Sequence, residues 1–412
     1  MYTAYSINRQ PQYRLDYLIE CSILAVAFFL PLSLDATTIF LGVGTALWAT
    51  KMIVARKLLL KRTPFDAIIA VLVILSAASI TASPDRGFSF YNYYHHMGRY
   101  IVLYYLVVNN LNSLQQVRRL VWSVMASAVL VSMYGFYQYV HGVDISNFQW
   151  VDGEQFPDLK VRVFSTLQNP NLLAGFLVAV MSLAVGQGLY AESVKSKLAL
   201  LGLFAVLGTC LVLTYSRGAW LSLVIVAAIC GRFYNRKVLW LLLVVPLVVF
   251  FSQDAVMGRI ISIFNPTDTS STLRIALWES TIAMIMDNPL FGIGWGAYWL
   301  VYPEYDFFLN NPDARIVHAH NMYLHIAAEI GIPGLVAFLA ILYGHTKKAV
   351  DVLSQTNNRR VAGLLLGIVA AVLGLAVNGF TDYIMFNVQM SMLFWLLNAI
   401  IIAIWQGLHH HN

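Results

Sequence analysis

The sequence predicts an all-α, polytopic membrane protein, and three observations support this fold class. Hydrophobic residues make up 59% of the 412 residues and charged residues only 11%, whereas about 25% of an ordinary soluble domain is charged. Apolar runs of about 20 residues, the length that crosses a bilayer as a helix, recur from Leu18 to Trp405. Lysine and arginine gather in alternate connections between these runs, as they do in membrane proteins.

About twelve spans fit the hydropathy of the chain. They lie near 16–33, 37–55, 65–82, 98–112, 119–140, 171–190, 197–215, 218–231, 238–251, 320–345, 361–379 and 389–406. We expect residues 1–412 to form a single integral-membrane domain. Its largest non-spanning part is a loop region of about 68 residues, 252–319, which precedes the tenth span.

The basic residues predict how the spans are oriented. All but eight of the 26 lysines and arginines fall in connections on one side, which the positive-inside rule assigns to the cytoplasm together with both termini. The eight on the other side are Arg86, Arg99, Lys160, Arg162, Arg217, Arg259, Arg274 and Arg315. Topology therefore explains the net charge of +6, whereas nucleic-acid binding would need one clustered basic face. We expect membrane lipids as neighbours and no nucleic-acid partner.

The cysteines and the N-terminus predict no further structural feature. Cys21, Cys210 and Cys230 all lie within apolar runs and form no Cys-x-x-Cys pattern, so neither a disulfide framework nor a cysteine-based zinc site is predicted. No cleavable signal peptide is expected, because the first apolar run continues without a small-residue cleavage site.

Two long segments lie on the outer side, at about 142–169 and 251–319. The second contains the stretch 272–286, in which Leu273, Leu277 and Met284 stand among polar neighbours at helical spacing. We expect a helix there that lies against the membrane or caps the bundle.

The run 318–321, His-Ala-His-Asn, is the most informative stretch of the chain. It places two imidazoles and an amide where a polar loop meets an apolar helix that contains Gly331 and Gly334. Polar groups in a membrane setting are usually kept for a function. The structural alternative is a histidine that is only a polar group at the membrane interface. Zinc binding would need further ligands at suitable spacing, and the sequence near the histidines supplies no carboxylate or cysteine that completes a set.

Three further polar residues of the last spans have structural interpretations. His325 and Glu329 stand four residues apart and can hydrogen-bond on one helical face. Glu329 lies roughly 13 Å beyond His320 along a helix, a depth that suits a structural partner or a counter-charge better than a catalytic acid. Asp382 lies in the last outer turn, where it could orient a histidine or pair with an arginine.

Two outer-face arginines stand out because they oppose the positive-inside bias. Arg217 lies in a tight turn, 214–220, between two apolar runs, and its planar donor fork suits phosphate. Contact with lipid headgroups is the alternative. Arg274 begins the amphipathic stretch, where a solvated helix face is the alternative. Arg259 and Arg315 are expected to be surface charges.

Three pieces of the chain, in this order, resemble the O-antigen ligase superfamily, which also contains the O-antigen polymerases and the bacterial O-linked oligosaccharyltransferases. They are 214–220, 274–296 (with Trp278, Pro289, Gly292 and Gly294) and 320–334. The pattern His-Asn, nine residues, Gly, two residues, Gly is similar to that of the O-antigen ligases (WaaL). The segment 164–171 also resembles one that recurs in the superfamily, so the resemblance covers about 163–334.

The resemblance implies a glycosyltransferase that acts on the periplasmic face of the bacterial inner membrane. Its donor would be a glycan on undecaprenyl diphosphate and its acceptor a sugar hydroxyl of the lipid A core, with neither a metal nor another cofactor. His320 matches the position of the family's base, and Arg217 and Arg274 match its functional arginines, which would bind the diphosphate. The further residues expected at the substrates are Asn321, His318 and Asp382.

Four functions remain open. The spacing after His320 and the one sizeable outer loop favour a ligase over an O-antigen polymerase. A protein O-oligosaccharyltransferase would carry a larger periplasmic portion after Trp405. A transporter of lipid-linked glycans would show broken helices or paired inverted halves, and the sequence indicates neither. The histidines at 409–411 could chelate metal, but we assign them no function.

Overall fold

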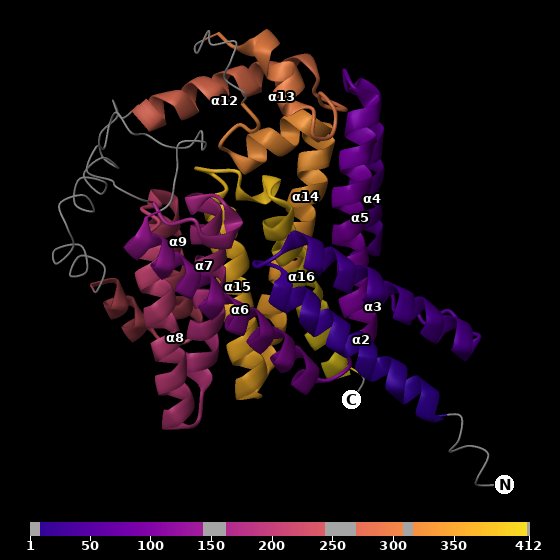
Figure 1. Ribbon diagram of the computed structural model, residues 1–412, viewed down its shortest axis with the longest axis vertical. Helices are drawn as coiled ribbons and strands as arrows, with labels where there is room; N and C mark the ends of the chain where they lie inside the picture. Colours follow the sequence, from indigo (N-terminus) through magenta and orange to yellow (C-terminus); the bar gives the residue numbers. More distant parts are fainter. Residues whose placement is uncertain (1–8, 143–161, 244–268, 308–315, 410–412) are drawn as a thin grey trace.

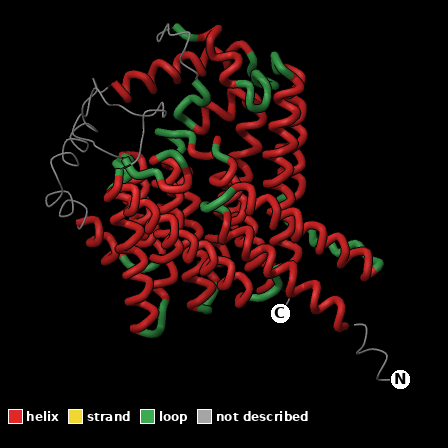
Figure 2. The backbone as a smooth tube through the Cα atoms, in the orientation of Figure 1, coloured by secondary structure: helices red, strands yellow, loops and turns green. Residues whose placement is uncertain are grey.

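The computed structural model describes residues 9–142, 162–243, 269–307 and 316–409. These residues form helices and connecting loops, without a strand (Figure 2). Seven of the described helices are long and apolar enough to cross a membrane. The predicted fold class, an all-α polytopic membrane protein, is thereby confirmed.

The helices coincide closely with the predicted spans. In chain order they are α2 (Arg9–Phe29), α3 (Leu34–Ala55), α4 (Asp66–Ser79), α5 (Arg86–Asn110), α6 (Leu114–His141), α7 (Pro170–Tyr190), α8 (Val194–Val212), α9 (Arg217–Phe233), α12 (Thr269–Asp287), α13 (Tyr298–Val301), α14 (Met322–Gln355), α15 (Arg359–Asn378) and α16 (Val388–His409). Short 3-10 turns occur at η1 (Ile80–Ala82), η2 (Ser165–Leu167), η3 (Arg236–Leu243), η5 (Tyr302–Tyr305) and η6 (Ile384–Phe386).

Every predicted span except that at 238–251 overlaps an α-helix. The exception begins in η3 and continues outside the described residues. The predicted outer segments, 142–169 and 252–319, are described only in part, and Lys160, Arg259 and Arg315 lie outside the described residues.

The core of the bundle is formed by α7, α15 and α16, whose residues are largely buried. α7 and α15 cross at glycines, because a side chain at Gly186 would collide with the backbone of Gly363 and Gly367. Such close approach of small residues is a common way to pack helices in membranes. By contrast, α2 and α3 extend outward from one side of the bundle (Figure 1), and α3 buries only four of its residues.

The bundle has two chemically different ends. α16 begins close to the turn that carries Asp382 and runs to the opposite end, where Gln406 donates a hydrogen bond to the carbonyl of Arg62 at 3.2 Å. At that same end Lys348 lies 4.7 Å from the ring centre of Trp405. Residues that the sequence assigns to the basic, cytoplasmic side therefore meet at the end of the bundle that lies away from Asp382.

The amphipathic stretch forms α12, which lies across the end of the bundle above α14 (Figure 1). Leu277 and Met284 of α12 are fully buried and form a small separate core with Tyr298, whose hydroxyl contacts the hydroxyl of Thr281 at 2.7 Å. Ile282 of the same helix is exposed. The prediction of a helix that caps the bundle is confirmed.

α14 is broken at the first of the two motif glycines. Gly331 has a left-handed backbone with φ of +74°, and Pro333 follows it. The break leaves carbonyls of the preceding turn without their helical partners. The loop after α12 supplies replacements, because the backbone N–H of Ile293 donates to Ala328 O at 2.8 Å and that of Gly294 to Glu329 O at 3.1 Å.

The docked loop also explains why glycine stands at position 331. The N–H of Ile332 donates to Pro289 O at 2.8 Å, and a side chain at Gly331 would collide with the carbonyl of Leu290. The prediction that the chain has no broken helix was therefore wrong. The sequence shows a glycine and a proline in α14, but not the distant loop that satisfies the broken turn. Backbone N–H groups of the docked loop satisfy Ala328 O and Glu329 O. The break thus has a structural explanation and alone does not favour a transporter.

Candidate active site

The run 318–321 forms the turn that leads into α14. The helix begins at Met322, two residues later than the predicted start of the tenth span, because Asn321 caps it. The side-chain oxygen of Asn321 accepts from the N–H groups of Tyr323 at 3.0 Å and Leu324 at 3.1 Å, the usual role of an N-cap asparagine. His320 therefore lies outside the helix, at its N-terminal end, with a left-handed φ of +48°.

This turn is fastened to the turn between α15 and α16. The amide of Asn321 donates to Phe380 O at 3.2 Å, and Met322 N donates to Gly379 O at 2.7 Å. Both the donor and the acceptor of the Asn321 side chain are thus used within the protein, so that this residue builds the site.

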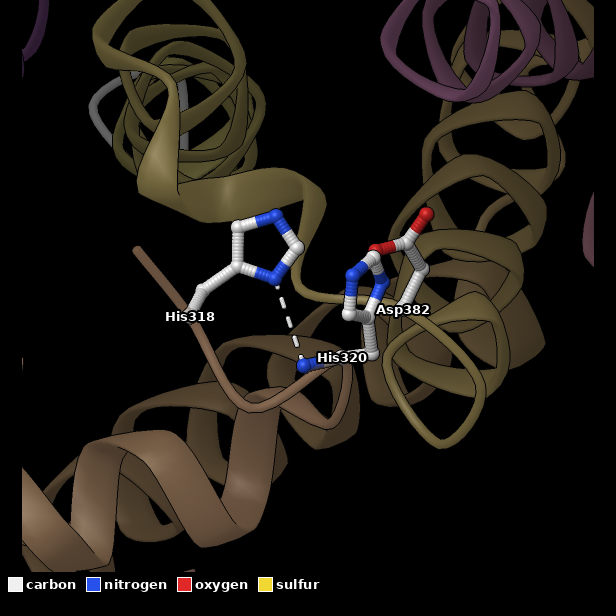
Figure 3. A group of neighbouring side chains, drawn as sticks. All are labelled: His318, His320 and Asp382. Carbon is white, nitrogen blue, oxygen red and sulfur yellow. Dashed lines mark hydrogen bonds and ion pairs between the residues drawn. The ribbon is translucent and has the colours of Figure 1, made fainter. Parts of the chain in front are cut away.

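His320 and Asp382 form a hydrogen-bonded pair, with Nδ1 of His320 3.1 Å from Oδ1 of Asp382 (Figure 3). The carboxylate is mostly buried, whereas about a third of the His320 side chain is exposed. An ionised carboxylate only accepts hydrogen bonds, so Nδ1 must carry the proton of the neutral ring. The other ring nitrogen, Nε2, is then left with a free lone pair and can act as a base.

Two residues that were not among the predicted site residues hold Asp382 in place. Asn171 donates from its amide to Oδ2 of Asp382 at 2.7 Å, and Arg162 donates to Oδ1 of Asn171 at 3.0 Å. Arg162 also donates to Thr214 O at 2.9 Å. The sequence held partial signals for both, since Arg162 is one of the eight outer basic residues and Asn171 ends the segment 164–171.

The electrostatics of the site favour an ionised Asp382 and a neutral His318. Burial alone would raise the pKa of Asp382, but the hydrogen bond and charge of His320, with smaller contributions from His318 and Arg274, hold it well below its usual range. Burial, followed by the charge of His320, lowers the pKa of His318 well below its ordinary value.

His318 lies in the interior of the site. It is buried, and its Nδ1 accepts from the backbone N–H of His320 at 3.2 Å (Figure 3). Its ring centre lies 4.6 Å from that of Phe386. It thereby holds the left-handed turn that presents His320. The buried position of His318 therefore favours a role in holding His320 in place over direct contact with substrate.

Arg217 is the first residue of α9, in the tight turn that the sequence predicts after α8. Its neighbour Gly218 packs against the turn that carries Asp382, since a side chain at Gly218 would lie 2.7 Å from the Thr381 hydroxyl. The structure thus brings the start of α9 next to Asp382, from a position 165 residues earlier in the chain.

Arg274 reaches the same region from α12, which packs against α14. After burial and the charge of His320, the charge of Arg274 contributes to the pKa shifts of both Asp382 and His318. Its charge therefore contributes to the electrostatics of the turn that carries His318 and His320.

The site contains a group of possible metal ligands. His318, His320 and Asp382 each offer a ligand atom, and these atoms lie within 4.8 Å of one another. The sequence near the histidines supplies no carboxylate, but the fold brings in Asp382, which lies 62 residues after His320. Two imidazoles and a carboxylate are donors that transition metals accept.

The expected pair deeper in α14 is present. Nε2 of His325 lies 3.2 Å from Oε1 of Glu329, and both side chains are buried. Glu329 is thus a partner of a histidine, one of the two structural roles that its depth suggested.

Part of the chain matches a known protein family. Residues 202–339 match the family model described as "O-Antigen ligase", whereas a comparison with curated proteins finds no match. The matched region contains Arg217, Arg274, the turn 318–321 and both motif glycines, and it ends before Asp382. The match supports the O-antigen ligase/polymerase superfamily for this part of the chain and does not distinguish WaaL-type ligases within it.

Proposed function

We propose that the protein is a glycosyltransferase that moves O-antigen polysaccharide from undecaprenyl diphosphate to a sugar hydroxyl of the lipid A core, which completes lipopolysaccharide. The observation that carries this proposal is the His320–Asp382 hydrogen bond at the capped start of α14, next to the helix that begins at Arg217. The superfamily match supplies the reaction class.

The geometry suits His320 as the general base. Asp382 accepts the proton of Nδ1, so Nε2 can take the proton of the acceptor hydroxyl as that oxygen attacks the anomeric carbon. The carboxylate also stabilises the imidazolium that forms, without itself taking the proton. Direct attack inverts the anomeric centre, since the bond to the diphosphate breaks on the opposite face.

Arg217 and Arg274 suit the leaving group. When the glycosidic bond to the carrier breaks, the undecaprenyl diphosphate gains negative charge, and preorganised cations lower the energy of that state. Arginine remains charged at all relevant pH values and binds phosphate oxygens through two donors. We therefore assign donor binding and leaving-group stabilisation to these two residues.

The proposed orientation places the active site in the periplasm and both termini in the cytoplasm of the bacterial inner membrane. It rests on the positive-inside rule, together with the basic residues at the end of the bundle away from Asp382. The donor, the acceptor and the surrounding lipids are then the partners of a single membrane domain.

An O-antigen polymerase is the main alternative, because the family match includes polymerases and the same base could act on a carrier-bound acceptor glycan. A strain lacking this protein separates the two. Loss of a ligase leaves lipid A core without O-antigen while polymer accumulates on its carrier. Core that carries a single repeat unit would instead identify a polymerase.

Binding of the donor should depend on the shape of the Arg217 side chain as well as on its charge. We expect Arg217→Ala and Arg274→Ala to weaken binding of a polyprenyl diphosphate analogue by about 10-fold to 100-fold, the effect of losing hydrogen bonds to a charged group. Arg217→Lys should also impair transfer, because an ammonium lacks the planar fork. Titration of the purified variants with the analogue measures these changes.

Arg86 provides a matched control, since it is also the first residue of a helix, α5, and is exposed. Its replacement by alanine should leave the affinity for the analogue unchanged. Unchanged affinity in both Arg217→Ala and Arg274→Ala would show that these arginines serve the membrane surface instead.

Transfer should continue without a divalent metal. No Asp-x-Asp motif occurs in the sequence, and arginine can supply the charge that a metal supplies in many glycosyltransferases. We expect purified protein with lipid-linked donor and lipid A core to be fully active in excess EDTA. Lost turnover that zinc restores would assign the metal to His318, His320 and Asp382. Recovery with magnesium or manganese would also contradict the prediction.

A further inference from the structure

Glu329 and His325 are ionisable residues in the interior of α14 that the proposed chemistry does not use. His325 is 3% exposed and Glu329 is 8% exposed. Burial of such groups in a membrane protein is costly and usually marks a function. Glu329 also lines a cavity of about 50 Å³ with Tyr100, Trp295 and Ser391, which is large enough for water.

His325 contacts the turn that carries the base. Its Nδ1 accepts from the backbone N–H of Ala319 at 3.4 Å, between His318 and His320. Because Nδ1 accepts, the proton of the neutral ring lies on Nε2, which then donates to Oε1 of Glu329 at 3.2 Å. Glu329 thereby fixes both the tautomer and the orientation of the His325 ring.

The same imidazole also contacts the turn that carries Asp382. Its ring centre lies 4.2 Å from that of Tyr383, whose backbone N–H donates to Oδ1 of Asp382 at 2.8 Å. His325, one turn inside the helix, thus contacts both the residue before His320 and the residue after Asp382.

Glu329 connects this pair to the loop after α12. Its carboxylate accepts from the N–H of Tyr298 at 3.4 Å, and its carbonyl accepts from the N–H of Gly294 at 3.1 Å. The loop that fills the break in α14 therefore restrains the Glu329 backbone, and the first residue of α13 restrains its side chain.

We propose that Glu329 and His325 are positioning residues that set the distance between His320 and Asp382. This inference rests on the proposed function of His320 as the base. Glu329 orients His325, and His325 holds Ala319 on one side and Tyr383 on the other. Loss of the Glu329 carboxylate frees the ring to turn, and the hydrogen bond between His320 and Asp382 then lengthens.

The test compares Glu329→Leu with Glu329→Gln in the full-length protein. Leucine cannot accept the hydrogen bond from His325, whereas the glutamine oxygen can. We expect Glu329→Leu to lower kcat about 10-fold to 100-fold, as loss of an outer partner of a functional histidine does. KM for the lipid-linked donor should change little, and Glu329→Gln should recover most of kcat.

A measurement of the hydrogen bond itself separates positioning from general structural support. Nδ1 of His320 lies 3.1 Å from Oδ1 of Asp382, and the ¹H shift of its Nδ1–H group reports the length of that bond. NMR of the protein with ¹⁵N-labelled histidine should show this proton moved upfield in Glu329→Leu, because the bond lengthens. In Glu329→Gln the proton should keep its wild-type shift.

His345 is the matched control, because it is a buried histidine of the same helix whose ring nitrogens contact Tyr104 and Ile341 instead. His345→Gln should leave the shift of the His320 Nδ1–H proton unchanged and kcat within about two-fold of wild type. An unchanged Nδ1–H shift in Glu329→Leu would overturn the positioning role. Failure of the wild-type protein to transfer glycan would overturn the proposed function but leave this NMR test intact.

Discussion

Replacement of His320 by alanine is expected to lower kcat for glycan transfer by roughly 10² to 10⁴-fold, the usual contribution of a general base. The protein should still fold and insert, because His320 lies outside α14 and is partly exposed. KM for the donor should change little, since we assign diphosphate binding to Arg217 and Arg274. Initial rates with purified protein, lipid-linked donor and lipid A core measure the effect.

His318→Ala is the internal control. It removes a neighbouring imidazole but leaves the hydrogen bond between His320 and Asp382, so its effect on kcat should be smaller. Transfer by His320→Ala within a few-fold of wild type would remove His320 from the role of base. A larger loss in His318→Ala than in His320→Ala would move that role to His318.

Hydropathy and local spacing predicted most of the scaffold. The apolar runs located the helices that form the core, and the amphipathic stretch 272–286 predicted α12, since both signals depend on residues close in sequence. The segment before α14 was also visible, because histidine and asparagine stand there at the start of an apolar run.

What the sequence did not predict are contacts between distant backbones. The loop after α12 fills the break at Gly331 with its own N–H groups, and no side-chain pattern encodes such an interaction. The position of Gly331 in the motif became interpretable only with the carbonyl of Leu290 beside it.

The hydrogen bonds that hold Asp382 in place could not be predicted from the sequence for a related reason. Asn171 reaches Asp382 from the start of α7, and Arg162 in turn contacts Asn171. Polar residues in an outer loop do not by themselves indicate such a partner. For Asp382 the sequence left two roles open. Asp382 could orient a histidine or pair with an arginine. The structure supports the first role, because Oδ1 of Asp382 lies 3.1 Å from Nδ1 of His320.

Asp382→Asn should lower kcat about as strongly as loss of the base, by roughly 10² to 10⁴-fold. Wild-type Asp382 accepts on both sides, from His320 at Oδ1 and from the amide of Asn171 at Oδ2. An asparagine has only one oxygen. If that oxygen faces Asn171, the introduced amide donates to Nδ1 of His320, which moves the ring proton to Nε2 and removes the base. If it faces His320, two NH₂ groups oppose each other.

The combined variant Asn171→Asp with Asp382→Asn tests this explanation. The exchanged carboxylate next to Arg162 can accept from the introduced amide, whose oxygen then accepts from Nδ1 of His320 and restores the correct tautomer. We expect the double variant to recover part of the kcat that Asp382→Asn loses, although the imidazolium is then farther from the negative charge. Asn171→Asp alone should impair transfer, because two carboxylates would face each other. A double variant no faster than Asp382→Asn would show that the charge of Asp382, and not the tautomer it selects, is what transfer requires.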